Sequence, residues 1–145
     1  MATFVNNLRL KEITTGDEDG TWGTSTNTNL ELITDAFSYG TKQMAADANE
    51  TFTMPNATAD ATRGFSLKIT SGVSLTGTRV VTLGPDTVNK VWVIENATTG
   101  GQTITIKQGS GGSVDIPTTA TQMLYADGAG TGAAVAKVNS AAGGI

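Results

Sequence analysis

Short runs in which apolar and polar residues alternate recur along most of this chain, and they constrain its fold more than any other feature. Each run is bounded by Gly, Pro or Asn. A period of two places alternate side chains on opposite faces of a strand. Seven or eight runs with no long helical pattern between them predict a mainly β fold, an antiparallel β-sandwich or barrel-like module. The runs lie at 51–54, 65–70, 79–83, 91–94, 103–107, 114–116, 123–125 and 135–138.

One run is apolar at every position. Val91, Trp92, Val93 and Ile94 follow one another without a polar residue between them. A strand that meets water on one face alternates, whereas a strand covered on both faces reads as a continuous apolar run. We therefore expect this strand to be buried on both faces.

The composition supports the β assignment. The chain of 145 residues holds 26 Thr and 18 Gly, and only 15% of its residues are charged. Threonine is β-branched and favours strands, and glycine supplies turns between them. A disordered low-complexity chain is the alternative, but the alternation of the apolar runs is too regular for it.

The charges divide the chain into two parts. Residues 1–63 carry four basic and nine acidic side chains, a net charge of −5, whereas residues 64–145 carry five and four, a net charge of +1. We expect an N-terminal anchoring segment over 1–45, made of an extended arm, a loop and a helix. A β-rich module over 46–145, ending in a C-terminus of small residues, would follow it.

The helix is expected over about 28–38. Leu30, Ile33 and Phe37 recur at the spacing of one helix face. Thr26, Asn27 or Thr28 can cap its start, and Gly40 is placed to end it. Trp22 would lie in the loop before the helix. It would either pack on that helix near Leu30 or Ile33, or insert into a partner as an anchor.

Several function classes are excluded by what the chain lacks. It has no Cys and no His, so it has no disulfide, no thiolate or imidazole metal site and no Ser-His or Cys-His catalysis. A net charge of −4 indicates no positively charged surface for binding a nucleic-acid backbone. No apolar run approaches the length of a membrane span. We expect no catalytic residue, no cofactor, no nucleic-acid partner and no membrane partner.

The densest acidic cluster is the candidate for a metal site. Asp17 and Asp19 lie in one turn with Glu18, and hard cations prefer several oxygens from one turn. The EF-hand pattern fails at Thr21 and has no Glu at its twelfth place. We therefore expect a solvated acidic turn and no metal.

The N-terminal segment resembles a known group of proteins. The stretches Asn7–Leu10, Thr15–Gly23 and Asn27–Ile33 form a pattern in which Trp-Gly is followed by Asn-x-Asn-Leu. This pattern is similar to the N-terminal region of tail-fibre-type proteins of tailed bacteriophages, notably marine ones. The resemblance covers about residues 6–34, and the Thr/Gly-rich strands beyond it match in style. It implies a virion location and a symmetric homotrimer.

These observations lead to one expected function and two alternatives. The first is a structural virion protein of tail-fibre type with no catalysis. It would dock on other virion proteins of the tail or capsid, and contact with the host surface is left open. The second is a capsid decoration protein that stabilises the phage head. The third is a carbohydrate-binding or depolymerising module. The docking residues we expect are Trp22, Gly23, Asn27, Asn29, Leu30, Ile33 and Phe37.

Overall fold

The computed structural model describes residues 1–138 and shows one helix and nine strands in two sheets. The fold is therefore mainly β, as predicted, but it is not a closed barrel. The expected C-terminal stretch of small residues, 139–145, lies outside the described residues. The elements are α1 (Trp22–Ala36), β1 (Tyr39–Met44), β2 (Glu50–Thr53), η1 (Ala61–Arg63), β3 (Ser66–Ser71), β4 (Arg79–Gly84), β5 (Asn89–Asn96), β6 (Ile104–Lys107), β7 (Val114–Ile116), β8 (Thr121–Asp127), η2 (Gly130–Gly132) and β9 (Val135–Lys137).

The predicted antiparallel arrangement is wrong for much of the fold. The five-stranded sheet has the order β1-β3-β5-β8-β9, and the four-stranded sheet has the order β2-β4-β6-β7. β1, β3 and β5 run parallel to one another, as do β2, β4 and β6. The antiparallel pairs are β5–β8, β6–β7 and β8–β9.

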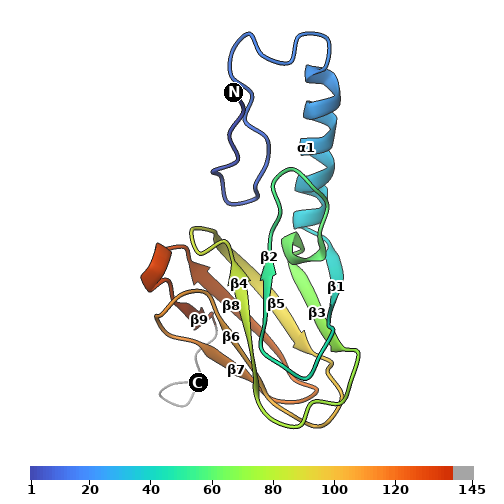
Figure 1. Cartoon of the computed structure of the whole chain (residues 1–145), viewed down its shortest axis with the longest axis vertical. Helices are drawn as coiled ribbons and strands as arrows, with labels where there is room; N and C mark the ends of the chain where they lie inside the picture. Colours follow the sequence, from blue (N-terminus) through green and yellow to red (C-terminus); the bar gives the residue numbers. More distant parts are fainter. Residues whose placement is uncertain (139–145) are drawn as a thin grey trace.

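Parallel pairing arises here without crossover helices. From β1 to β6 successive strands alternate between the two sheets, so each strand lies parallel to the strand two places earlier in the chain (Figure 1). In the five-stranded sheet Tyr39 pairs with Ser66, and Ser66 pairs with Val93. Paired positions on successive parallel strands of this sheet are therefore 27 residues apart (39, 66, 93). A parallel pair needs a crossover connection. In this protein a strand provides it.

Buried amide side chains hold the connections that follow β5 and β6. The Asn96 Nδ2 donates to the carbonyls of Gln102 and Ile116, both at 2.9 Å, and its Oδ1 accepts from the Thr98 hydroxyl at 2.6 Å. The Gln108 Nε2 donates to the Val88 carbonyl at 2.7 Å. Buried polar groups cost free energy unless they are bonded. These bonds therefore define the path of the chain at both turns.

One hydrophobic core lies between the two sheets and draws on both. It holds Trp92 and Ile94 of β5 together with residues of the opposite sheet such as Leu83 and Ile106, and each of these side chains is at most 1% exposed. The expectation that residues 91–94 are buried on both faces is wrong for this single chain. Val91 points away from the core and is 39% exposed.

Lys90 and Trp92 connect η1 to the five-stranded sheet. The Trp92 Nε1 donates to the Thr62 carbonyl at 2.8 Å. The Lys90 Nζ lies 4.6 Å from the centre of the Trp92 ring and donates to the Gly64 carbonyl at 3.0 Å. Burial nevertheless lowers the pKa of the Lys90 ammonium to about 8, since it removes water from the charge.

The helix is longer than predicted and begins earlier. It runs from Trp22 to Ala36, so Trp22 is its first residue and does not lie in the preceding loop. Thr21 is the N-cap residue, without a side-chain cap bond, and Phe37 is the C-cap residue. Gly40 lies in β1 and does not end the helix. In the described part of the chain no helix has the length and apolar character needed to cross a membrane.

The sheet begins before the domain boundary expected at residue 45. β1 pairs with β3 over its whole length, so residues 39–44 belong to the β module. Figure 1 shows α1 and the N-terminal loop rising together from one end of the sheets. β1 therefore lies within the segment expected over 1–45 and is a strand of the five-stranded sheet.

The lowered pKa of Lys90 gives a stability prediction with a defined sign. Between the folded value of about 8 and the ordinary value of 10.5 the unfolded chain binds more protons, so stability rises with pH. We expect the free energy of unfolding to rise by about 2 kcal/mol between pH 8 and pH 10, relative to a Lys90→Met variant. Urea unfolding of both proteins across this range measures it. A constant difference between them would show that Lys90 titrates at its ordinary pKa.

Candidate docking surface on the N-terminal helix

The N-terminal residues form a closed loop beside α1, and the extended arm expected from the sequence is not observed. Thr3 and Glu12 form an isolated antiparallel bridge, with backbone bonds of 3.0 and 2.8 Å. Inside the loop, the Asn6 Oδ1 accepts from the backbone N–H groups of Leu8 and Leu10. An asparagine that bonds the backbone ahead of it favours a turn over a strand. Residues 8–13 accordingly form no strand.

The buried guanidinium of Arg63 joins this loop to the β module. Arg63 has no exposed surface, and its three nitrogens donate to the carbonyls of Leu8 at 2.8 Å, Thr58 at 2.7 Å and Pro55 at 2.6 Å. Burial lowers the pKa of Arg63, and the nearby Asp60 carboxylate opposes this shift. Arginine stays protonated in proteins, so the group remains a charged donor to all three carbonyls.

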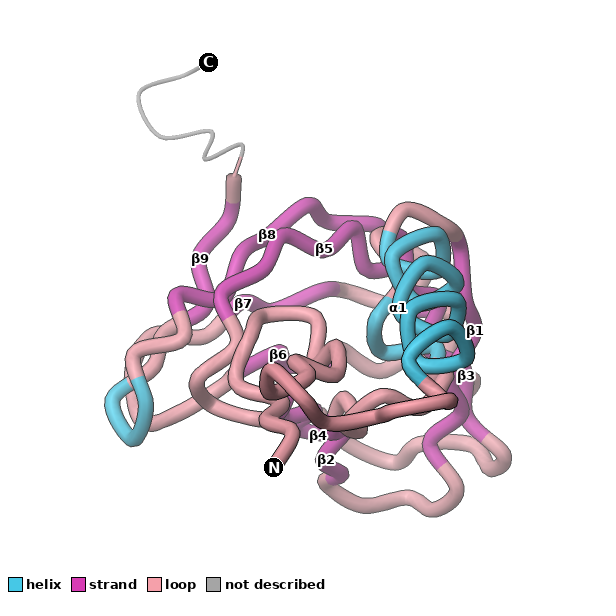
Figure 2. The backbone as a smooth tube through the Cα atoms, turned by 90° about the horizontal axis from the view of Figure 1, so that it is seen from above, coloured by secondary structure: helices cyan, strands magenta, loops and turns pink. Residues whose placement is uncertain are grey.

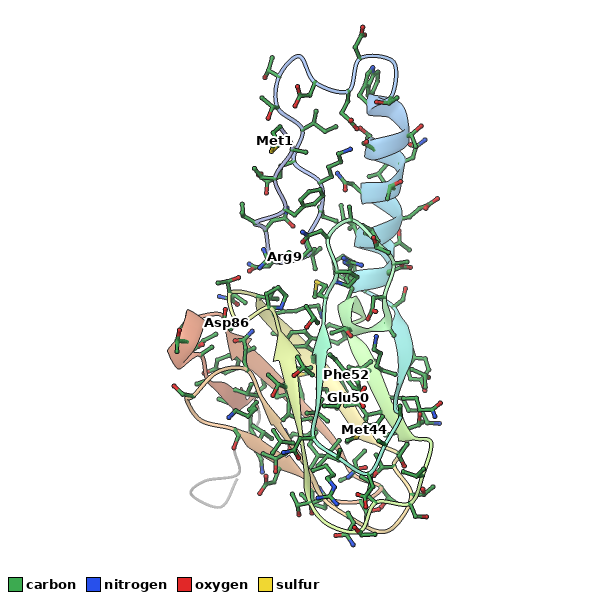
Figure 3. All side chains as sticks on the ribbon, in the orientation of Figure 1. Met1, Arg9, Met44, Glu50, Phe52 and Asp86 are labelled. Atoms are coloured by element: carbon green, nitrogen blue, oxygen red, sulfur yellow. The ribbon has the colours of Figure 1, made fainter. Side chains whose placement is uncertain are left out.

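Arg9 makes the second connection. Its backbone has φ of +54°, and its carbonyl accepts from the Ala57 N–H at 2.8 Å. Its guanidinium donates to the Thr87 hydroxyl at 2.6 Å, and nearby the Asn7 side chain accepts from the Asn89 N–H at 2.9 Å. Figure 3 shows Arg9 at the end of the N-terminal loop closest to the strands. The loop is thus attached to the body at several separate points.

Asn29 attaches the helix to the same loop. Its side-chain amide pairs with the backbone of Lys11, donating to the carbonyl at 2.9 Å and accepting from the N–H at 3.0 Å. The Glu18 carboxylate accepts from the Lys11 ammonium at 2.7 Å and from the Ser25 hydroxyl. These bonds lower the pKa of Glu18. Asn29, expected in partner docking, therefore makes an internal contact.

An apolar strip runs along the exposed side of α1, and we call Trp22, Leu30, Ile33 and Phe37 the helix strip. At 100° per residue they fall within an arc of about 80°. Trp22 is 63% exposed, Leu30 56% and Phe37 80%, whereas Ile33 is half-buried. Neither the Trp22 side chain nor Leu30 is covered by this chain. The structure thus places the predicted residues on one side of a helix and leaves most of their surface in water.

The buried side of the helix lies next to the helix strip, and the sequence pattern did not identify it. Leu32 and Ala36 are its buried members. Figure 2, seen from above, shows α1 over the β1 and β3 side of the molecule, with the N-terminal loop beside it. Of the other predicted docking residues, Asn27 is exposed and Gly23 is half-buried.

A second apolar surface, missed by our sequence reading of the site, lies on the outer side of the five-stranded sheet. The signal was present in runs such as 91–94 and 123–125, which lack polar residues. We call this surface the outer β face. It consists of Val91, Val93, Met123, Tyr125 and Val138.

The acidic residues do not assemble into a metal site. Asp17 lies 2.8 Å from the N-terminal ammonium, and Asp19 is exposed. Among residues 1–138 no group of three or more Asp, Glu, His or Cys side chains is placed to hold a metal ion.

One cavity of about 340 Å³ brings two carboxylates together. Asp35 and Asp60 line it, with Tyr39 at its wall. Burial raises the pKa of Asp60, but bonds from the Lys42 ammonium and from Thr62 outweigh it and hold the pKa below its ordinary value. A general acid of a glycosidase needs a raised pKa. Asp60 is therefore a poor general acid.

Comparisons with protein-family models, with curated proteins and with solved structures give no match for this chain.

The contacts of Arg63 generate a stability prediction. In an Arg63→Met variant the carbonyls of Leu8, Thr58 and Pro55 lose their donors while remaining near buried surface. We expect a loss of about 3 kcal/mol in the free energy of unfolding. The backbone N–H of Ala57, which bonds the Arg9 carbonyl, should also exchange with solvent faster. Urea unfolding and hydrogen exchange measure the two effects.

Arg79→Met is the matched control, because it removes a guanidinium whose partner Asp47, 2.7 Å away, lies near the surface. The control should lose much less stability and leave exchange at Ala57 unchanged. Equal losses in both variants would contradict the role given to Arg63.

Proposed function

We propose that this chain is a structural bacteriophage virion protein of tail-fibre type. It docks on another virion protein through the helix strip and assembles with copies of itself, as a homotrimer, through its β module. The two sheets packed on one core are interpreted as a β-sandwich. Such a protein makes and breaks no covalent bond.

The observation that carries the proposal is the helix strip. Three large apolar side chains stand in water on a helix that rises from the end of the sheets (Figure 1). Tryptophan is enriched among the residues that dominate binding energy at interfaces. The connections from Arg63 and Asn29 hold the loop and the helix in place, so little order has to be gained when the strip binds.

The folded N-terminal loop favours tail-fibre docking over head decoration by an extended N-terminal arm. That form needs a free arm lying across neighbouring capsid subunits. Here residues 1–14 close on themselves through the Thr3–Glu12 bridge and are attached to the β module through Arg9. Head decoration would therefore require the loop to open, or a different contact.

The copy number of the protein in purified virions distinguishes these assignments. Quantitative mass spectrometry against the major capsid protein measures it. A few to a few tens of copies would support a tail or fibre appendage. Hundreds of copies would assign the protein to the head surface. Absence from the particle would overturn the virion proposal as a whole.

A Trp22→Ala variant tests the docking surface itself. Loss of a central interface tryptophan weakens binding by about 2 kcal/mol, roughly thirty-fold. We expect the copies per virion to fall strongly while circular dichroism and the melting temperature stay near those of the parent, because Trp22 is largely exposed.

Glu31→Ala is the matched control, since Glu31 is exposed and lies about 180° around the helix from Trp22 at 100° per residue. It should be incorporated normally. Normal incorporation of Trp22→Ala as well would remove Trp22 from the docking role.

A further inference from the structure

The outer faces of the two sheets differ in the side chains that they expose to solvent. Along β5 and β8 the inward residues, such as Trp92 and Leu124, are buried in the core, so the alternate residues point outward. In the middle of both strands those outward residues are apolar: Val91 is 39% exposed, Met123 36% and Tyr125 42%. The outward residues at the strand ends are polar, namely Asn89, Glu95, Thr121 and Asp127. A sheet face that stays in water normally carries polar side chains.

The four-stranded sheet provides the comparison within the same molecule. Its inward residues are buried, and its outward residues are mostly threonine or charged. Those outward residues are Thr51, Thr53, Val80, Thr82, Thr105, Lys107 and Asp115. One outer face is thus suited to water and the other is not, although the same chain builds both.

The apolar side chains of the outer β face are contiguous. Val91 pairs with Tyr125 and Val93 pairs with Met123 across β5 and β8. The Val138 N–H donates to the Met123 carbonyl at 3.1 Å, which continues the face onto the residue that follows β9. Cross-strand neighbours have their Cβ atoms about 5 Å apart, so these side chains form one surface.

We propose that a second copy of this chain covers the outer β face, which is the surface of self-association. The inference rests on the self-assembly part of the proposed function and not on docking to a virion. The centre of the face carries no charged side chain, so it presents no charge pattern for a partner of opposite sign. At its margin Lys68 and Glu95 are register partners of opposite sign, which suits a surface that meets its own copy.

The size of the face agrees with this occupant. A large side chain has roughly 150–250 Å² of surface. Val91, Met123, Tyr125 and Val138 are 36–48% exposed, which leaves roughly 300 Å² of surface on this face. An interface of standard size covers roughly 800 Å² on each partner, of which a little over half is apolar. The outer β face therefore supplies the larger share of the apolar part of one such interface.

The polar outer face of the other sheet limits how copies can stack. Apolar surface is available on one side of the β module, so copies meet through that side, and the threonine-rich side stays in water. Such contacts close into a small symmetric assembly and do not continue into an open stack. The continuous apolar run at 91–94 is then buried on both faces in the assembly, though not in a single copy.

The test is the molar mass of the purified protein in solution. Light scattering after size exclusion, run over a range of concentrations, measures it for the parent and for Tyr125→Lys, which places like charges on facing copies. We expect the parent to be oligomeric and the variant to need at least a tenfold higher concentration to associate. Met123→Lys serves as a second variant if Tyr125→Lys proves unfolded by circular dichroism. Thr51→Lys, on the outer side of the other sheet, is the matched control and should behave as the parent.

The outcomes separate the two proposals. If the parent is oligomeric and Tyr125→Lys and Met123→Lys associate as the parent does, the outer β face is not the contact, and self-assembly itself still stands. If the parent is a monomer at its highest soluble concentration, both the inference and the proposed self-assembly fail. Neither result changes what the copy number and Trp22→Ala say about virion docking.

Discussion

The guanidinium of Arg63 is the contact on which the arrangement of this molecule depends. It is fully buried and donates to carbonyls from the N-terminal loop and from the segment that follows β2. Those carbonyls would otherwise lack partners near the core, and an unbonded buried carbonyl is costly. One side chain therefore satisfies both segments. Through the loop it also positions α1, because Asn29 of the helix is bonded to Lys11 of the loop.

The β module is held together by a different device. The chain passes from one sheet to the other at each step from β1 to β6, and so builds parallel pairs with no covering helix. The core between the sheets is shared, and each strand contributes one face to it. The buried amides of Asn96 and Gln108 satisfy carbonyls at the turns. The sheets consequently do not need the helix to cover them, and one side of the helix remains exposed.

Two apolar surfaces result, and they are separate in the fold. The helix strip belongs to the N-terminal segment that rises from the end of the sheets, whereas the outer β face belongs to β5, β8 and the residues paired with them (Figure 1). We assign the first to docking on another protein and the second to copies of this chain. Symmetric copies would present several helix strips at once, and linked contacts strengthen binding without any new contact at each one.

The sequence by itself determined the local preferences. The period of two predicted strands near most of their observed positions, and the spacing of Leu30, Ile33 and Phe37 identified an apolar side of a helix. The apolar run at 91–94 also predicted cover on both faces of a strand, whereas Val91 is 39% exposed in the single chain. Tertiary structure decided the rest. Strand direction depends on which sheet the chain enters next, and alternation is the same in parallel and antiparallel strands. The helix start at Trp22 depends on the Glu18 carbonyl, which accepts from the N–H groups of Thr21 and Trp22. The role of Arg63 depends on the Leu8 carbonyl, 55 residues away in the sequence, meeting the carbonyls of Pro55 and Thr58, and no local pattern of residues can encode that meeting.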